Sequence, residues 1–132
     1  MIVAGIGCRQ GAPAGDVEAA IRAALACAEV GADALDANAT LARKSAEPAI
    51  VAAAQTFGVA VVRVSETEIE AAGGRAVTRS ARVLALTGIA SVAEAAALAA
   101  AGSAARLITP RLVVGAATCA LAAAHAAPEA AP

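Results

Sequence analysis

The sequence predicts an α/β fold: a three-layer α/β/α sandwich with a mixed central sheet of about five strands. Short apolar runs, typical of buried strands, alternate with alanine-rich or amphipathic segments, typical of helices, along the whole chain. No long linker and no fixed-period repeat interrupts this order, and such an alternation places helices on both faces of one sheet. The 132 residues favour one core. We expect a single domain over residues 1–122 and an Ala/Pro-rich tail over 123–132.

The first part of the chain is expected to form two strands and two helices. Residues 1–6 are an apolar run that ends in glycines, which indicates a buried strand. Residues 14–30 carry apolar side chains at helical spacing behind an acidic first turn, and a glycine follows them. Residues 34–40 are expected to form a short strand. Residues 45–57 are expected to form a helix with Ser45 as its cap, a proline in its first turn and a glycine after its end.

The middle of the chain continues the alternation. Residues 59–64 are rich in β-branched side chains and predict a strand. Ser65 and Glu68 have the spacing of a capping box, so a short helix should follow until two consecutive glycines break it. Residues 77–86 are expected to contain a strand with one exposed face.

The last third predicts one helix and the final strands. Ser91 and Glu94 form a second capping box, which opens an alanine-rich helix that ends before Gly102. Residues 107–109 and 112–122 are expected to be strands. In sheets of this kind ligands bind at the carboxyl ends of the strands, so a site is expected where the glycine-rich turn and the turn of residues 40–48 meet.

Composition argues against several classes of function. The net charge is −1 and Trp and Tyr are absent, so neither a basic field nor stacking aromatics favour nucleic-acid binding. Three distant cysteines without CxxC spacing argue against a disulfide framework and a zinc site, and neither a metal nor a cofactor is expected. The longest charge-free run, residues 112–128, is shorter than a membrane span. With no signal-peptide features at the N-terminus, a cytoplasmic protein that binds no membrane is expected.

The charges are unevenly distributed along the chain. After residue 70 the acids are only Glu94 and Glu129, whereas five arginines are present, and nine of the ten basic residues in the chain are arginine. A GC-rich genome accounts for the arginine bias itself. The functional interpretation is that some of these guanidinium groups face a ligand rich in carboxylates, whose geometry they match.

The glycine-rich segment of residues 5–11, GIGCRQG, follows the first expected strand. Backbone N–H groups in such a loop can bind an anion. As a dinucleotide fingerprint the segment is imperfect, because its third glycine falls one position late. A structural turn, an anion-binding loop and a nucleotide-binding loop all remain open from this segment alone.

Four stretches, in order, resemble the CobE/CbiG C-terminal family. Residues 5–11 resemble its opening G-I-G-C-R-basic-G, and residues 40–48 resemble its T-x-x-x-K-x-x-E-P segment. Residues 88–97 resemble its G-x-x-S-V-A-E-A-A-A stretch, and residues 110–122 its closing P-K…T-x-A-x-A strand. The resemblance covers nearly the whole of residues 1–122.

This resemblance implies a role in cobalamin (vitamin B12) biosynthesis, of the CobE type. The implied ligand is a precorrin or corrinoid intermediate, a macrocycle that carries acetate and propionate carboxylates. An alternative that the resemblance also implies is opening of a lactone on cobalt-precorrin-5A with release of acetaldehyde, the hydrolase activity of CbiG proteins. A third possibility is a partner protein that supports other enzymes of the pathway. The candidate ligand-binding residues are Gly5, Gly7, Cys8, Arg9, Gly11, Thr40, Lys44, Glu47, Arg111 and Thr118.

Three of these residues are also candidates for catalysis, and each has a simpler interpretation. Cys8 is a nucleophile if the helix N-terminus and Arg9 lower its pKa, or else a small buried side chain in a tight turn. Lys44 pairs with a substrate carboxylate or is simply solvated. Glu47 is a general acid or base, or it stabilises a helix dipole. Glu94 is assigned to the capping box and not to chemistry, and the one histidine, His125, lies in the tail.

Overall fold

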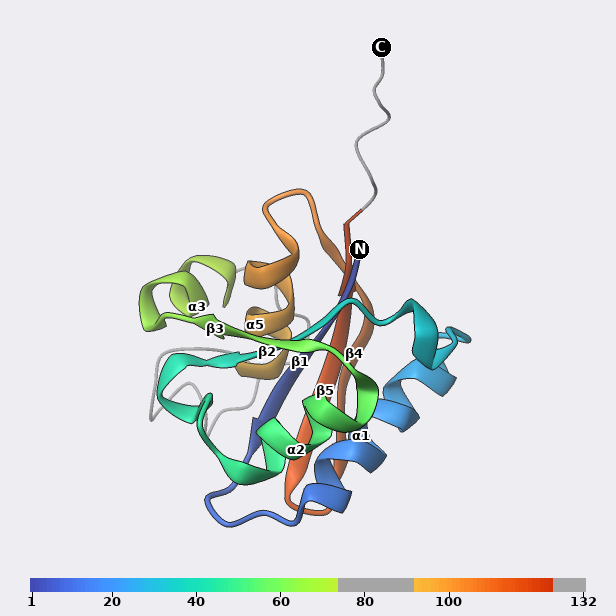
Figure 1. The fold of residues 1–132 in the computed structure, drawn as a ribbon. Helices are drawn as coiled ribbons and strands as arrows, with labels where there is room; N and C mark the ends of the chain where they lie inside the picture. Colours follow the sequence, from blue (N-terminus) through green and yellow to red (C-terminus); the bar gives the residue numbers. More distant parts are fainter. Residues whose placement is uncertain (74–91, 125–132) are drawn as a thin grey trace.

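The computed structural model describes residues 1–73 and 92–124. Within them, five strands form one sheet in the order β3-β2-β1-β5-β4 (Figure 1). Strands β1 (Ile2–Cys8), β2 (Ala37–Leu41) and β3 (Ala60–Val64) are parallel. Strand β5 (Ala117–Ala123) is antiparallel to both of its neighbours, β1 and β4 (Arg106–Val114). The sheet is therefore mixed, as the sequence predicts.

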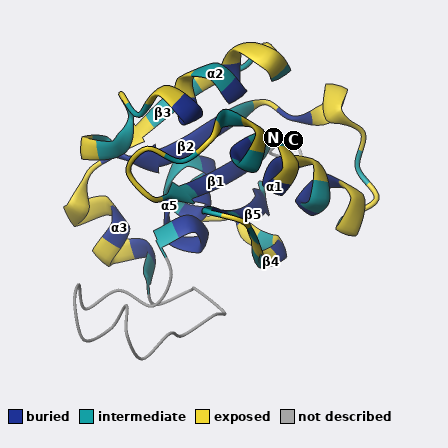
Figure 2. Ribbon diagram, turned by 90° about the horizontal axis from the view of Figure 1, so that it is seen from below, coloured by how far each residue is buried: buried dark blue, intermediate teal, exposed yellow. Residues whose placement is uncertain are grey.

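Helices cover both faces of this sheet and complete a three-layer α/β/α sandwich (Figures 1 and 2). Helices α1 (Ala14–Cys27) and α2 (Pro48–Phe57) contribute to one buried cluster, with alternate residues of β1 and β5. Helices α3 (Glu66–Gly73) and α5 (Val92–Ala101) contribute to a second cluster on the opposite face. The predicted fold class is confirmed.

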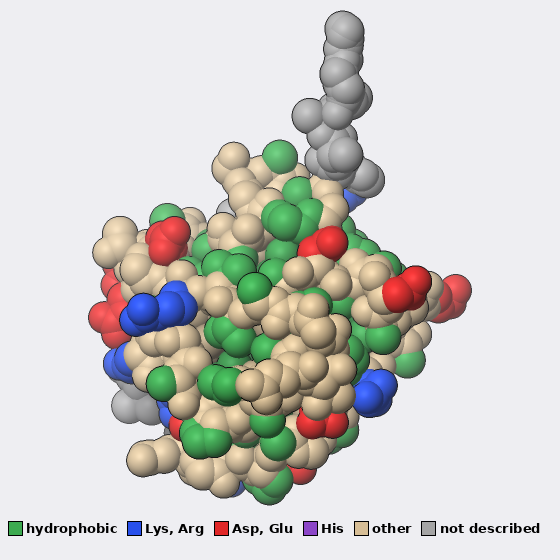
Figure 3. Space-filling model, viewed as in Figure 1, with side chains coloured by type: hydrophobic (Ala, Val, Ile, Leu, Met, Phe, Trp, Pro, Cys, Tyr) green, Lys and Arg blue, Asp and Glu red, His purple; other side chains and the backbone are tan. Residues whose placement is uncertain are grey.

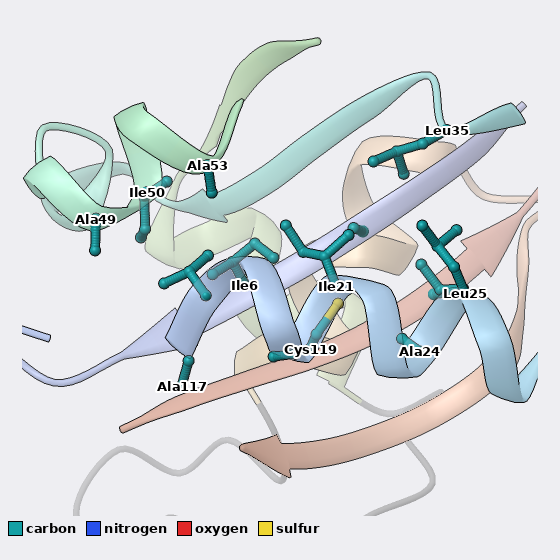
Figure 4. Packing of buried hydrophobic residues seen from close by; sticks show 14 residues of the cluster. Ile6, Ile21, Ala24, Leu25, Leu35, Ala49, Ile50, Ala53, Ala117 and Cys119 are labelled. Atoms are coloured by element: carbon teal, nitrogen blue, oxygen red, sulfur yellow. The ribbon is translucent and has the colours of Figure 1, made fainter. Parts of the chain in front are cut away.

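The two clusters differ in how densely they are packed with large side chains. On the α1/α2 face, Ile6, Ile21 and Ile50 are fully buried and interdigitate between the helices and the sheet (Figure 4). On the other face, α5 presents mainly alanines to the strands. Small side chains allow a helix backbone to approach a sheet closely. The absence of a side chain at Gly5 allows α5 to come closer still, because a Cβ there would lie 2.7 Å from the Ala97 nitrogen. Helix α5 thus lies directly on β1.

Several predicted boundaries are confirmed. Helix α1 begins at Ala14, and Gly58 ends α2 with a left-handed φ of 70°. The capping box of α3 is formed as predicted: Ser65 N donates to Glu68 Oε1 at 2.9 Å, and Glu68 N donates to Ser65 Oγ at 3.1 Å.

Several boundaries were predicted wrongly. Strand β2, expected from residue 34, begins at Ala37, and residues 32–34 form a 3₁₀ turn instead. Glu47, not Ser45, is at the N-cap of α2, because Ser45 Oγ donates to the Ala42 carbonyl within the 3₁₀ turn of residues 42–44. Strand β1 runs two residues further than predicted, to Cys8, along its antiparallel partner β5. Helix α1 ends at Cys27, well before Gly31. The strand expected over 112–122 is the end of β4, a turn and β5.

Several predictions concern residues outside the described ones: the strand within 77–86, the cap at Ser91 and the tail that holds His125. Within the described ranges, no helix is both long and apolar enough to cross a membrane. Figure 3 shows charged side chains scattered around the rim of the face on which α2 and β3 lie, with apolar side chains across its middle.

Candidate functional site

The candidate site lies at the edge of the sheet where β1, β2 and β4 end. Four segments meet there: the residues after Cys8, the 3₁₀ turn of residues 42–44 after β2, the 115–116 turn between β4 and β5, and the N-terminal turn of α5. Figure 2 views the molecule from this side. The expectation that the two loops after β1 and β2 adjoin the same region follows from the parallel pairing of those strands.

The larger of two cavities at this edge has a volume of about 360 Å³. Its walls come from the end of β1, the start of α5, the outer part of β4 and the hairpin turn. Among the described residues, Arg9 and Arg111 are the charged ones that line it. The lining residues are Gly7, Cys8, Arg9, Val92, Ala93, Arg111, Val113, Gly115, Ala116, Ala117 and Thr118.

A smaller cavity of about 170 Å³ lies on the other side of the end of β1. Arg43 and Lys44, from the turn after β2, are its charged lining residues. The described residues that line it are Ile6, Gly7, Cys8, Thr40, Leu41, Arg43, Lys44 and Val92. Because Gly7, Cys8 and Val92 line both cavities, we treat the two as lobes of one site and call these three shared residues the ridge.

Among the described residues, the charged side chains that line the two lobes are all positive. The nearby carboxylates of Asp16 and Glu94 bond to the backbone of lining residues but do not line either lobe themselves. In the part of the chain that the structure describes, Arg43 is paired with Glu66 at 3.1 Å, with both side chains about two-thirds exposed, whereas Arg9, Lys44 and Arg111 have no ion pair. Three cations that form no ion pair with a described residue, around one edge of the sheet, favour an anionic ligand.

The walls of the larger lobe are held together by hydrogen bonds in which the main chain donates or accepts. Arg9 N donates to the Ala116 carbonyl at 3.1 Å, and Ala116 N donates to Asp16 Oδ2 at 2.9 Å. Thr118 Oγ1 donates to the Gly7 carbonyl at 3.3 Å, and a Cβ at Gly7 would lie 2.7 Å from that hydroxyl oxygen. The hairpin turn, the start of α1 and the end of β1 are thereby fixed to one another.

Glu47 has a structural contact that the sequence did not suggest. Its Oε2 accepts a hydrogen bond from Gly11 N at 2.9 Å, and Gly11 has a φ of 78°, in the left-handed region that glycine tolerates. Glu47 thus ties the loop after β1 to the start of α2. Thr40 also has a structural contact, since its buried hydroxyl donates to the Ile6 carbonyl at 3.0 Å and so links β2 to β1.

The structure therefore divides the ten candidate ligand-binding residues into two groups. Seven line a lobe: Gly7, Cys8, Arg9, Thr40, Lys44, Arg111 and Thr118. Gly5, Gly11 and Glu47 line neither lobe; Gly5 admits α5, and Gly11 and Glu47 shape the loop. The sequence analysis missed Arg43, Val92 and Val113. Arg43 sits beside Lys44 in the same turn, and Val92 lies in the family stretch of residues 88–97, so both could have been predicted, whereas nothing local marks Val113.

The electrostatics of Cys8 oppose a nucleophilic role. Burial raises the pKa of the Cys8 thiol, the Glu47 carboxylate raises it further, and the Lys44 ammonium group acts in the opposite direction. A thiol activated for attack needs a lowered pKa, so the lowered pKa on which the nucleophilic interpretation of Cys8 depends is not found. Cys119, in the core beneath α1 (Figure 4), is more strongly affected: burial raises its pKa to about 12.

We expect Cys8 to react slowly with iodoacetamide at neutral pH. Because its pKa is raised, the rate of alkylation should increase at a higher pH than it does for an ordinary thiol. Glu47→Gln keeps a hydrogen-bond acceptor for Gly11 but removes the negative charge, so it should lower the pKa of Cys8 and speed alkylation about two- to tenfold near neutral pH. Lys44→Ala should slow it. Peptide mass spectrometry measures the rates, with the exposed Cys27 as an internal reference. An unchanged rate in Glu47→Gln would contradict this electrostatic account.

No group of three or more His, Cys, Asp or Glu side chains that could hold a metal ion occurs among residues 1–73 and 92–124. The described residues of the site offer guanidinium and ammonium groups beside the apolar ridge, whereas the N–H groups of Arg9 and Gly11 in the glycine-rich loop are already bonded to the Ala116 carbonyl and to Glu47 Oε2.

Sequence comparison identifies relatives over nearly the whole chain. The family model described as cobalamin synthesis G C-terminus matches residues 2–122. The curated protein CobE from Sinorhizobium sp is 42% identical over 121 residues, which cover 92% of this chain and 79% of the relative.

Structural comparison agrees with the sequence comparison. A crystal structure of CobE, a protein from the cobalamin (vitamin B12) biosynthetic pathway, superposes with a TM-score of 0.86 and 32% identity, covering 95% of this chain and 91% of that one. The cobalamin biosynthesis protein chiG from Agrobacterium tumefaciens str. C58 gives a TM-score of 0.75 and 36% identity over 96% of this chain and all of that one.

Proposed function

Because the chain belongs to the cobalamin synthesis G C-terminus family and is a cobalamin biosynthesis protein of the CobE type, we propose that it binds a precorrin or corrinoid intermediate at the two-lobed site and presents it to the next step of the pathway. The observation that carries this proposal is the set of cations without an ion pair among the described residues, Arg9, Lys44 and Arg111, on both sides of one apolar ridge.

The charges support a ligand with several carboxylates. Intermediates of this pathway carry acetate and propionate arms around a flat ring, so carboxylates leave the ring in different directions. A guanidinium group matches a carboxylate with two parallel hydrogen bonds, whereas an ammonium group acts as a compact charge. Arg9 and Arg111 would bind arms in the larger lobe, and Lys44 an arm in the smaller one.

The volumes of the lobes support presentation rather than enclosure. Pockets that enclose a drug-sized molecule span about 300–1,000 Å³, and the lobes measure about 360 and 170 Å³. A tetrapyrrole macrocycle is larger than a drug-sized ligand, so each lobe suits one or two carboxylate arms rather than the ring. The ring would then rest across the ridge, with Val92 and the 61% exposed Val113 against it, and much of it would stay accessible to a partner enzyme.

We expect affinity to depend on the charge of the ligand's arms. A corrinoid with free carboxylates should bind, with a shift in its visible absorbance, whereas a fully amidated corrinoid with the same ring should bind at least about a hundredfold more weakly, the loss expected for two charged contacts. Absorbance titration and calorimetry measure both affinities.

Two results of this experiment would count against the proposal. Equal affinity for the acid and the amide would mean that the cations do not recognise the ligand. Release of acetaldehyde from a lactone-bearing precorrin would instead support the lactone-opening activity, and the same titration samples can be assayed for it. Binding of the acid form without conversion is the result that the proposal predicts.

A further inference from the structure

We infer that Glu94 is a positioning residue that holds Arg111 at the larger lobe by accepting a hydrogen bond from the Arg111 backbone. The inference rests on the proposed function, since it assigns a role in ligand binding to a side chain that does not itself line the site.

Strand β4 is irregular at the point where Arg111 lies. Its pairing with β5 shifts in register between Leu107 and Thr109 and again between Thr109 and Leu112. Pro110, immediately before Arg111, has no N–H group to donate. Each shift places an extra residue in β4 relative to β5, as in a β-bulge. Such extra residues change the direction of a strand's side chains and leave backbone groups without a partner in the β-ladder. The orientation of Arg111 therefore needs a contact from outside the β-ladder.

Glu94, on the first turn of α5, supplies that contact. Its Oε2 accepts a hydrogen bond of 2.8 Å from Arg111 N, and its side chain is fully buried. Burying a carboxylate costs free energy unless hydrogen bonds compensate, and the bond from Arg111 N is one such compensating contact. Val92 and Ala93 of the same turn line the larger lobe with Arg111, so the contact fixes one wall of the lobe to another.

The guanidinium group of Arg111 is left available by this arrangement. Among the residues that the structure describes, Arg111 forms no ion pair, although a carboxylate is bonded to its own backbone. Glu94 thus fixes the position of the Arg111 backbone and does not form an ion pair with the Arg111 guanidinium group. The half-buried Arg111 can then bind a carboxylate arm in the lobe.

Two substitutions of similar size separate the hydrogen bond from the charge. Glu94→Gln keeps an oxygen acceptor for Arg111 N and removes the negative charge, whereas Glu94→Met keeps the volume and suits the apolar surroundings but offers only a weakly accepting sulfur. We expect Glu94→Gln to bind the acid corrinoid as tightly as the wild type or more tightly. Glu94→Met should bind it about tenfold more weakly, as Arg111→Ala should, the loss expected for one charge-assisted contact.

The double variant Glu94→Met/Arg111→Ala decides whether Glu94 acts through Arg111. If it does, the double variant should lose about tenfold in affinity, as each single variant does, rather than the roughly hundredfold of two independent sites. Absorbance titration measures the affinities, and circular dichroism confirms that each variant is folded.

Three results would overturn the inference. They are a roughly hundredfold loss of affinity in the double variant, a lower affinity of Glu94→Gln than of the wild type, and an affinity of Glu94→Met equal to that of the wild type. Failure of the proposed function looks different, because the wild type itself would then bind no acid corrinoid, and the inference would fall with it. Since Glu94→Gln retains the hydrogen bond, its affinity remains informative even if Glu94→Met is unstable.

Discussion

Replacing Gly5 with alanine is expected to detach α5 from the sheet. A Cβ at this position would overlap the Ala93 carbonyl oxygen and would lie 2.7 Å from the Ala97 nitrogen and 2.9 Å from the Ala97 Cβ. Two of these three atoms belong to the helix backbone, so no side-chain rotation relieves the overlap and the whole helix must move. Overpacking of a core costs about 1–3 kcal/mol and sometimes more, and this contact belongs to the upper end of that range.

The loss should be visible in both stability and binding. We expect the free energy of unfolding to fall by about 3 kcal/mol or more, and the melting temperature by about 10 °C, for a domain of this size. Because α5 carries Val92 and Ala93 to the larger lobe, any folded Gly5→Ala protein should also bind the acid corrinoid poorly. Thermal unfolding followed by circular dichroism measures the first effect, and absorbance titration measures the second.

Gly15→Ala is the matched control for this prediction. Gly15 lies in the first turn of α1, is exposed, and has no heavy atom within 4 Å of the position of an added Cβ. Alanine there should leave the protein unchanged or raise its stability by up to about 1 kcal/mol. If Gly5→Ala melted within a degree or two of Gly15→Ala, the close packing of α5 on β1 would be refuted.

Removing a cation from either lobe is expected to weaken ligand binding. Arg9 and Lys44 lie on opposite sides of the ridge, and neither has an ion pair among the described residues. We expect Arg9→Ala and Lys44→Ala each to lower affinity for the acid corrinoid by about tenfold, the loss expected for one charged contact. Because salt screens such contacts, the affinity of both variants should fall less steeply with ionic strength than that of the wild type.

Arg106→Ala provides a control with the same change in net charge. Arg106 begins β4, the strand that carries Arg111, but it pairs with Ala123 at the opposite end of the sheet from the site. Its removal should change the affinity for the acid corrinoid by no more than about twofold, because salt screens the interaction between the ligand and a distant charge. An effect as large as that of Arg9→Ala would mean that affinity depends on overall charge rather than on the site.

The sequence was sufficient to predict that the loops after β1 and β2 meet at one edge of the sheet. Parallel strands direct their carboxyl ends to one edge, so the alternation of strands and helices already placed the loop after Cys8 beside the turn that holds Lys44. Capping patterns located α3 correctly because Ser65 and Glu68 bond within one turn. Such local contacts can be predicted from a few neighbouring residues.

Contacts between distant residues could not be predicted in this way. Glu94 fits a capping-box pattern, which gave no sign that its carboxylate reaches Arg111, seventeen positions along the chain. The pattern around Glu47 suggested chemistry or a helix dipole, whereas the structure shows a bond to Gly11 across two loops. The apolar ridge likewise depends on how closely α5 approaches β1, which tertiary packing decides.

The account depends most on the claim that both lobes bind carboxylate arms of the same ligand. Titration of the Arg9→Ala/Lys44→Ala double variant with an acid corrinoid, beside the wild type, tests it most directly. If both lobes contribute, the double variant should lose about a hundredfold in affinity, the product of two single losses. Affinity equal to that of the wild type, in a folded double variant, would contradict the claim and remove the proposed site.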